Sequence, residues 1–249
     1  MSSALMLDFL SELREHNSLD WMHAHEQQKR DAQNAFVELV QGCIDELAVE
    51  EPALAALDPK SLVFRINRDT RFSDEKSPYN PAFRAHISPA GSLPVPVGYY
   101  LHVAPGGSFA GGGLFAPHFK DATRLMREHI AADPQAFLDI VEEPAFAARF
   151  QFVGTPLKRV PQGFDADSPA AAYLKCKSWA VEEHLQDDAI GCDTLVESFR
   201  AMRVFNQWMN AALEGFEMPR RWGAGLDLRV ALPLWGGGGL HPPSPRGST

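Results

Sequence analysis

The chain has 249 residues, of which 45% are hydrophobic and 10% aromatic, and this composition is typical of a globular protein rather than a disordered or fibrous one. Its formal net charge of -9 excludes nucleic acids and anionic membranes as partners of the whole surface, because both select basic proteins. Three cysteines without CxxC spacing, no secretion signal at the N-terminus and no run of about 18 apolar residues together predict a cytoplasmic protein that does not enter a membrane.

Apolar side chains recur at helical spacing over the N-terminal part of the chain. Leu5, Phe9 and Leu13 predict a short helix over residues 4–15. A longer helix is predicted from about residue 20 to residue 49, where Pro52 follows. The apolar stripe of this longer helix is Phe36, Leu39, Val40, Cys43, Ile44 and Leu47.

The periodicity changes from helical to alternating at Ser61. The segments LVFRIN (62–67), FRAHIS (83–88) and YYLHVA (99–104) alternate between two faces, as half-buried strands do. A turn and a glycine-rich strand follow within PGGSFAGGG (105–113). Because the links between these segments are short, we expect an antiparallel meander rather than a parallel sheet.

The alternation divides the expected sheet into two faces. The face packed under helices should hold Phe64, Ile66, Phe83, Ala85, Ile87, Tyr99, Leu101 and Val103. The opposite face, expected to be uncovered, should present Arg65, Asn67, Arg84, His86, Tyr100 and His102. These side chains supply hydrogen-bond donors and groups that titrate near neutrality, so the pattern favours a polar binding surface.

Helical signals return in the second half of the chain. Leu125, Met126 and Ile130 mark one helix, and Asp133 followed by Pro134 marks the start of another. Asp167 or Ser168 before Pro169 repeats that start signal, and CKSWAVEEHL (176–185) is compatible with a further strand. The last helix is predicted from about Asp193 to Glu214, with Gly215 as its cap.

This order of elements predicts an α+β fold, with an antiparallel sheet meander covered on one face by helices. Residues 1–218 are expected to form a single domain. Residues 219–249 change composition abruptly and contain four arginines, one acid and a run of glycines followed by prolines. Such a segment cannot pack a core, so we expect a disordered tail, either an appendage or a reading-frame artefact.

Three stretches carry a resemblance to a known family: residues 65–79, 98–117 and 157–179. Together they resemble the domain of unknown function 2461 family, which consists of conserved hypothetical proteins of bacteria and fungi. The resemblance covers roughly residues 4–216. It departs from the family pattern near the N-terminus, where Trp21, Met22 and His25 replace the usual Trp-Phe followed by Asn. The resemblance implies one compact domain and supplies no catalytic residues.

The stretch from Arg65 to Tyr79 is rich in charge, with four bases against three acids in an otherwise acidic chain. One interpretation is an internal ion-pair network that locks the connection between two strands. The other is an anion pocket built from Arg65, Arg68 and Arg71 with Lys76. Exposed ion pairs contribute only about 0–1 kcal/mol each, so a purely structural network of exposed pairs would stabilise the fold little.

We hypothesise from these patterns that the protein binds a small anionic ligand bearing a phosphate or a carboxylate. Lys158, Lys175 and Lys177 form either a solvated basic edge or a second wall of the same pocket. The hypothetical ligand-binding set is Arg65, Asn67, Arg68, Arg71, Lys76, Arg84, His86, Tyr100, His102, Lys158, Lys175 and Lys177. The alternatives are a hydrolase or transferase acting on a phosphorylated substrate, and a protein-interaction module whose arginines are purely structural. The sequence assigns no metal ligands, cofactor or catalytic residues.

Overall fold

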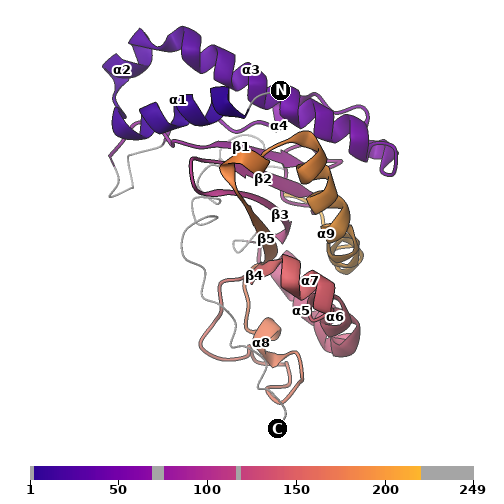
Figure 1. Cartoon of the computed structure of the whole chain (residues 1–249). Helices are drawn as coiled ribbons and strands as arrows, with labels where there is room; N and C mark the ends of the chain where they lie inside the picture. Colours follow the sequence, from indigo (N-terminus) through magenta and orange to yellow (C-terminus); the bar gives the residue numbers. More distant parts are fainter. Residues whose placement is uncertain (1–2, 69–75, 116–118, 220–249) are drawn as a thin grey trace.

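The computed structural model describes residues 3–68, 76–115 and 119–219 (Figure 1). Over these residues the predicted α+β fold is confirmed, with an antiparallel sheet and a helical layer. The helices are α1 (Ala4–Glu15), α2 (Leu19–Ala24), α3 (Glu26–Leu47), α4 (Pro59–Leu62), α5 (Lys120–Ala132), α6 (Pro134–Val141), α7 (Pro144–Arg149), α8 (Ala171–Leu174) and α9 (Cys192–Ala212). The strands are β1 (Phe83–Ile87), β2 (Tyr99–Val103), β3 (Ser108–Leu114), β4 (Gln151–Val153) and β5 (Trp179–Leu185). Short 3-10 turns lie at Pro52–Leu54 and Asp187–Ala189.

The five strands form one sheet in the order β1-β2-β3-β5-β4, and every neighbouring pair is antiparallel. The first three strands are the predicted meander. The segment 176–185, whose sequence was compatible with a further strand, contains β5, which pairs with β3. The short strand β4 was not predicted from the sequence, because three residues are too few to show an alternation.

Helices α3 and α9 cover one face of the sheet and pack against each other (Figure 1). Phe36 of α3 stacks on Phe83 of β1 with ring centroids 5.4 Å apart, and Phe199 of α9 packs on Tyr99 of β2 at 5.0 Å. Gly112 of β3 lets α9 approach the sheet closely, because a Cβ atom there would lie 2.7 Å from the Met202 sulfur. The main hydrophobic core therefore lies between the sheet and these two helices.

The long helix predicted from residue 20 is interrupted at His25, which separates α2 from α3. Ser18 caps α2 by accepting a hydrogen bond from the Trp21 backbone N–H. The His25 ring stacks on Trp21 with centroids 4.1 Å apart, and its Nδ1 lies 2.7 Å from the Trp21 carbonyl oxygen. These local interactions stabilise a non-helical His25 backbone, which hydrophobic periodicity does not reveal.

The expected first strand, 62–67, is not a regular strand. Asp58 caps the short helix α4, which begins at Pro59 and ends at Leu62, so Leu62 is helical and not part of a strand. The chain then runs beside β1 through the isolated Val63–Ala85 bridge and the hydrogen bond from Phe64 N–H to the Arg84 carbonyl oxygen, at 2.9 Å. Val63 is opposite Ala85 in the register, so Phe64 lies on the other face of the sheet. The prediction that placed Phe64 on the helix-covered face is therefore wrong.

The predicted helix ends are largely confirmed. The Asp133 carboxylate accepts a hydrogen bond from Ala136 N–H at 3.0 Å and Pro134 opens α6. Gly215, just after α9, has a φ of 81°. Within the described residues no helix is long and apolar enough to span a membrane. Of the expected tail, residues 220–249 lie outside the described residues.

Candidate functional site

Two rows of side chains cross the sheet on the face opposite α3 and α9. The antiparallel register aligns Arg84, His102, Phe109 and His184 in one row. It aligns His86, Tyr100, Gly111 and Glu182 in the second row. We call these eight residues the polar face. Four of them, Arg84, His86, Tyr100 and His102, were predicted from the sequence to share this side of the sheet.

Most of the polar face is buried, with only His184 exposed, and the expectation of an uncovered face is wrong. Arg84 and His86 are each 6% exposed, Glu182 is 5% exposed and Tyr100 is fully buried. A small second hydrophobic cluster lies on this side of the sheet and contributes to the burial. Its residues are Phe64, Tyr100, Phe109, Phe115 and Ala180. Aromatic packing thus helps to remove from water a face that carries charged and titratable groups.

Arg84 is a buried cation with an incomplete set of partners. Its guanidinium carbon lies 5.9 Å from the centroid of the Phe64 ring, which gives a cation–π contact. Its Nε–H has no hydrogen-bond acceptor, and among the described residues no carboxylate lies within ion-pair distance of it. A guanidinium stays charged in proteins, so this group cannot avoid the cost of burial by losing its proton.

The two histidines beside Arg84 are held in the neutral form. Burial lowers the pKa of His86 to about 4, partly opposed by a hydrogen bond with the backbone of Gly91. Burial lowers the pKa of His102 to about 3, and the charges of Arg84 and His184 lower it further. Both Nδ1 atoms lack a hydrogen-bond partner within the part of the chain that the structure describes.

Tyr100 and Glu182 flank Gly111 in the second row. Burial raises the pKa of the Tyr100 hydroxyl well above its usual value, and the neighbouring Arg84 opposes that shift. The Glu182 carboxylate lies 3.7 Å from Nε2 of the exposed His184. Gly111 adds no side chain between Tyr100 and Glu182. At neutral pH, the polar face combines one guanidinium, neutral hydrogen-bonding groups and a carboxylate.

Sequence reasoning did not select Glu182 and His184. The only signal in the sequence was that the two residues are separated by one position within the segment 176–185. In a strand, this i, i+2 spacing puts both side chains on one face. Which face that is depends on the pairing of β5 with β3, a contact between residues far apart in the chain. Periodicity within one segment carries no information about that pairing.

The charged stretch that first suggested a site is only partly brought to the polar face. Arg65 and Asn67 are exposed on the segment beside β1, whereas Arg84 is buried. Arg68 is half-buried and Lys76 exposed, and each has an interaction partner in the structure. Arg71 lies outside the described residues. An anion pocket formed by Arg65, Arg68 and Arg71 with Lys76 stays a prediction.

The three lysines proposed as a second wall lie elsewhere. Lys158 is exposed, and Lys175 and Lys177 are half-buried. Lys177 N–H donates to the Thr155 carbonyl oxygen at 2.9 Å, in a short ladder that includes the bridge between Pro156 and Cys176. This ladder adjoins α8, well away from β1 (Figure 1). The structure therefore does not place the lysines together with Arg84.

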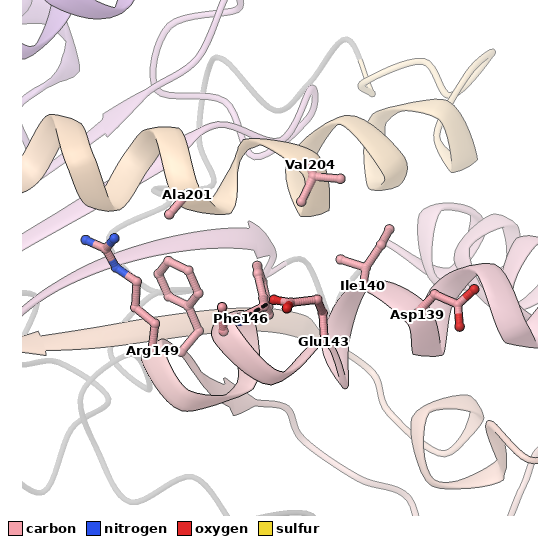
Figure 2. A pocket seen from close by; sticks show the side chains of 9 residues that line it. Asp139, Ile140, Glu143, Phe146, Arg149, Ala201 and Val204 are labelled. Carbon is pink, nitrogen blue, oxygen red and sulfur yellow. Dashed lines mark hydrogen bonds between the residues drawn. The ribbon is translucent and has the colours of Figure 1, made fainter.

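A separate hollow lies between α6, α7 and α9, with a volume of about 340 Å³ (Figure 2). Its charged residues already have partners. Glu143 accepts a hydrogen bond from Phe146 N–H at 2.7 Å, and Asp139 accepts one from Gln135 at 2.7 Å. Arg149 donates to Glu183 at 2.8 Å. Because these partners are present, this hollow offers a weaker case for ligand recognition than the polar face.

Comparison with known proteins gives one match. A family model described as "Conserved hypothetical protein (DUF2461)" matches residues 5–208, a range that contains every strand of the sheet and the whole polar face. No curated protein and no solved structure matches the chain.

Proposed function

Since the chain belongs to the DUF2461 family of conserved hypothetical proteins, we propose a function from the geometry of the polar face: the protein binds a small ligand that bears a carboxylate or phosphate group. Arg84 recognises the negative charge. Tyr100, His86 and His102 donate or accept hydrogen bonds around it.

The observation that carries this proposal is the Nε–H of the buried Arg84, which has no hydrogen-bond acceptor although the guanidinium also interacts with the Tyr100 hydroxyl. A buried charge that lacks its partner costs about 3–5 kcal/mol relative to the paired state. An oxygen atom of a bound anion beside Nε would offset that cost. The Nε–H and one Nη–H of arginine point in parallel, and a carboxylate or phosphate can accept both hydrogen bonds at once. Phe64 contacts the guanidinium through its ring and cannot supply such an acceptor.

The neighbouring groups favour an anion of low charge. His86 and His102 are neutral at pH 7, because burial lowers their pKa values to about 4 and about 3, so neither adds a positive charge. Glu182 is also on this face and repels a second negative charge. Within the described residues, a carboxylate or a singly charged phosphate ester therefore matches the face better than a polyphosphate.

Binding is better supported than catalysis. A hydrolase or transferase would need a general base with a pKa near the working pH, since proton transfer is then most effective. The lowered pKa values make His86 and His102 weak bases at pH 7.

Thermal unfolding in the presence of carboxylates and phosphate diesters, which carry a single negative charge at pH 7, tests the proposal. A ligand at 100 times its Kd stabilises a protein by about 2.7 kcal/mol, which shifts the Tm of a chain of this size by about 5–10 °C. We expect such a shift for the wild type and for Arg65→Ala, in which an exposed arginine is removed. Arg84→Met, which keeps the length of the side chain, should lose it. A set of anions that stabilises Arg84→Met as much as the wild type would rule the proposal out.

A further inference from the structure

Two of the three cysteines meet where α3 packs against α9. Cys43 is fully buried in α3, and Cys192 is half-buried as the first residue of α9. The two thiols are free and lie close enough for each to shift the pKa of the other. The spacing of the three cysteines in the sequence gave no indication of this contact.

Gly42 makes the contact between the two helices close. A Cβ atom at this position would lie 3.1 Å from the sulfur of Cys192, tighter than most Cβ contacts in proteins. A glycine inside a long helix costs about 1 kcal/mol relative to alanine, so its presence in α3 calls for a packing reason. The small residue beside Cys43 lets the Cys192 thiol lie directly against α3.

The two thiols differ in their readiness to ionise. The pKa of Cys192 is lowered to about 7, mainly by the hydrogen bond from Cys43, although burial and the carboxylates of Asp193, Glu46 and Asp45 act in the opposite direction. The backbone N–H groups at the start of α9 also favour a thiolate there. The pKa of Cys43 is raised by its hydrogen bond to Cys192, by burial and by the charge of Cys192.

This arrangement pairs an accessible thiolate with a buried protonated thiol, which are the two parts that a reversible disulfide needs. We propose that Cys43 and Cys192 are a redox modification site, at which a peroxide converts the two thiols to an intramolecular disulfide that joins α3 to α9. This site lies on the helix-covered side of the sheet, and it does not depend on ligand binding at the polar face.

The reaction proceeds in two steps. The Cys192 thiolate attacks one oxygen of hydrogen peroxide; an S–O bond forms, the O–O bond breaks, and the released hydroxide takes up the proton that Cys192 had lost. The sulfur of Cys43 then attacks the sulfenic sulfur of Cys192. The S–S bond forms, the S–O bond breaks, and the departing hydroxide leaves as water with the Cys43 proton. Two sulfur atoms lose one electron each, and the peroxide is reduced to two waters.

The test uses the full chain, reduced and then treated with hydrogen peroxide, blocked with an alkylating agent and mapped by peptide mass spectrometry. We expect one disulfide-linked peptide pair containing Cys43 and Cys192, reversed by dithiothreitol, with Cys176 still alkylated after unfolding. Cys176→Ala is the matched control and should give the same linked pair. In Cys43→Ala, Cys192 should stop at the sulfenic acid and react with dimedone.

Two results would overturn the proposal. One is a wild-type protein that keeps all three thiols under peroxide that fully oxidises a small reference thiol of similar pKa. The other is a disulfide that contains Cys176 or joins two chains. Because the wild type alone distinguishes these outcomes, the test does not depend on any variant folding.

Discussion

Arg127 of α5 donates a 2.7 Å hydrogen bond from Nη2 to the carbonyl oxygen of Cys176. Its Nε donates a second hydrogen bond to the Leu174 carbonyl oxygen at 3.0 Å, and the guanidinium lies 5.6 Å from the Trp179 ring. Arg127 thus fastens the segment between α8 and β5 to α5. Among the described residues, Arg84 and Arg127 are both buried over an aromatic ring; Arg127 donates to two backbone carbonyls, whereas the Nε–H of Arg84 has no acceptor.

Replacing Arg127 by methionine should destabilise the fold. The change removes both charged hydrogen bonds and leaves the carbonyl oxygens of Leu174 and Cys176 without their partner. Hydrogen bonds to charged groups contribute about 1.5–3 kcal/mol each, so we expect a loss of about 2–4 kcal/mol in the free energy of unfolding. Urea denaturation followed by circular dichroism measures it. An unchanged midpoint would show that these hydrogen bonds do not anchor α8.

Replacing Arg84 by methionine should have the opposite consequence for the ligand-free protein. Methionine fills a similar volume and removes a buried charge whose Nε–H is unmatched. Exchanging poorly compensated buried charges for apolar side chains is often neutral or stabilising by about 1–4 kcal/mol. The same urea experiment, run beside Arg127→Met, provides the comparison. A destabilisation as large as that of Arg127→Met would mean that Arg84 already has a strong partner in the fold.

Stability should fall as the pH is lowered below neutrality. The pKa values of His86 and His102 are lowered in the folded protein to about 4 and about 3, so the unfolded chain, with histidines near 6.5, binds more protons over this interval. Their contribution is complete above about pH 6.5 and decreases as the pH falls toward those folded values. Each of the two histidines should lower the free energy of unfolding by up to about 1.4 kcal/mol for each pH unit below 6.5. Urea midpoints between pH 7 and pH 5 measure the slope.

A matched substitution isolates these two histidines from other groups. His102→Gln should reduce the pH dependence, whereas His184→Gln, which removes only the smallest of the causes that lower the His102 pKa, should reduce it much less. Equal slopes for the wild type and His102→Gln would contradict the assignment.

The alkylation rate of Cys192 should rise through about pH 7, since only the thiolate reacts and its pKa is lowered to about that value. Cys43→Ala removes the hydrogen bond that is the largest cause of the lowering. The midpoint of the rate profile should therefore move to higher pH in that variant. Iodoacetamide labelling at a series of pH values, quantified by mass spectrometry, measures both midpoints. Identical profiles would show that Cys43 does not influence Cys192.

Gly112→Ala should separate α9 from the sheet. The added Cβ would lie 2.7 Å from the Met202 sulfur and 2.8 Å from the amide oxygen of Asn206, a residue whose Nδ2 donates a hydrogen bond to the Gly98 carbonyl oxygen just before β2. Overpacking of this kind costs about 1–3 kcal/mol. Gly107→Ala is the control, because a Cβ there meets nothing within 4 Å. Thermal unfolding of the two variants should show a lower Tm for Gly112→Ala alone.

Local patterns in the sequence predicted the elements better than the contacts between them. The alternation in β1 and β2 placed Arg84, His86, Tyr100 and His102 on one face, because within a strand side-chain direction follows from position alone. The same rule failed at Phe64, where α4 changes the phase of the chain before it reaches the sheet.

Pairing between distant segments was beyond such patterns. The alignment of Glu182 with Gly111 depends on β5 lying beside β3, and the meeting of Cys43 with Cys192 depends on the packing of α3 against α9. Burial of the polar face depends on aromatic residues contributed by the segments before β1 and after β3. None of these is a property of a short window of sequence.

The backbone contacts that align the segment after α4 with β1 have a consequence for how copies of the protein meet. They pair the outer side of β1 through Phe64 N–H and the Val63–Ala85 bridge, while at the opposite end of the sheet β4 is only three residues long. Within the part of the chain that the structure describes, neither border of the sheet thus presents a long row of open backbone groups, which is the template that an added strand from another molecule requires. This construction protects the sheet from edge-to-edge aggregation.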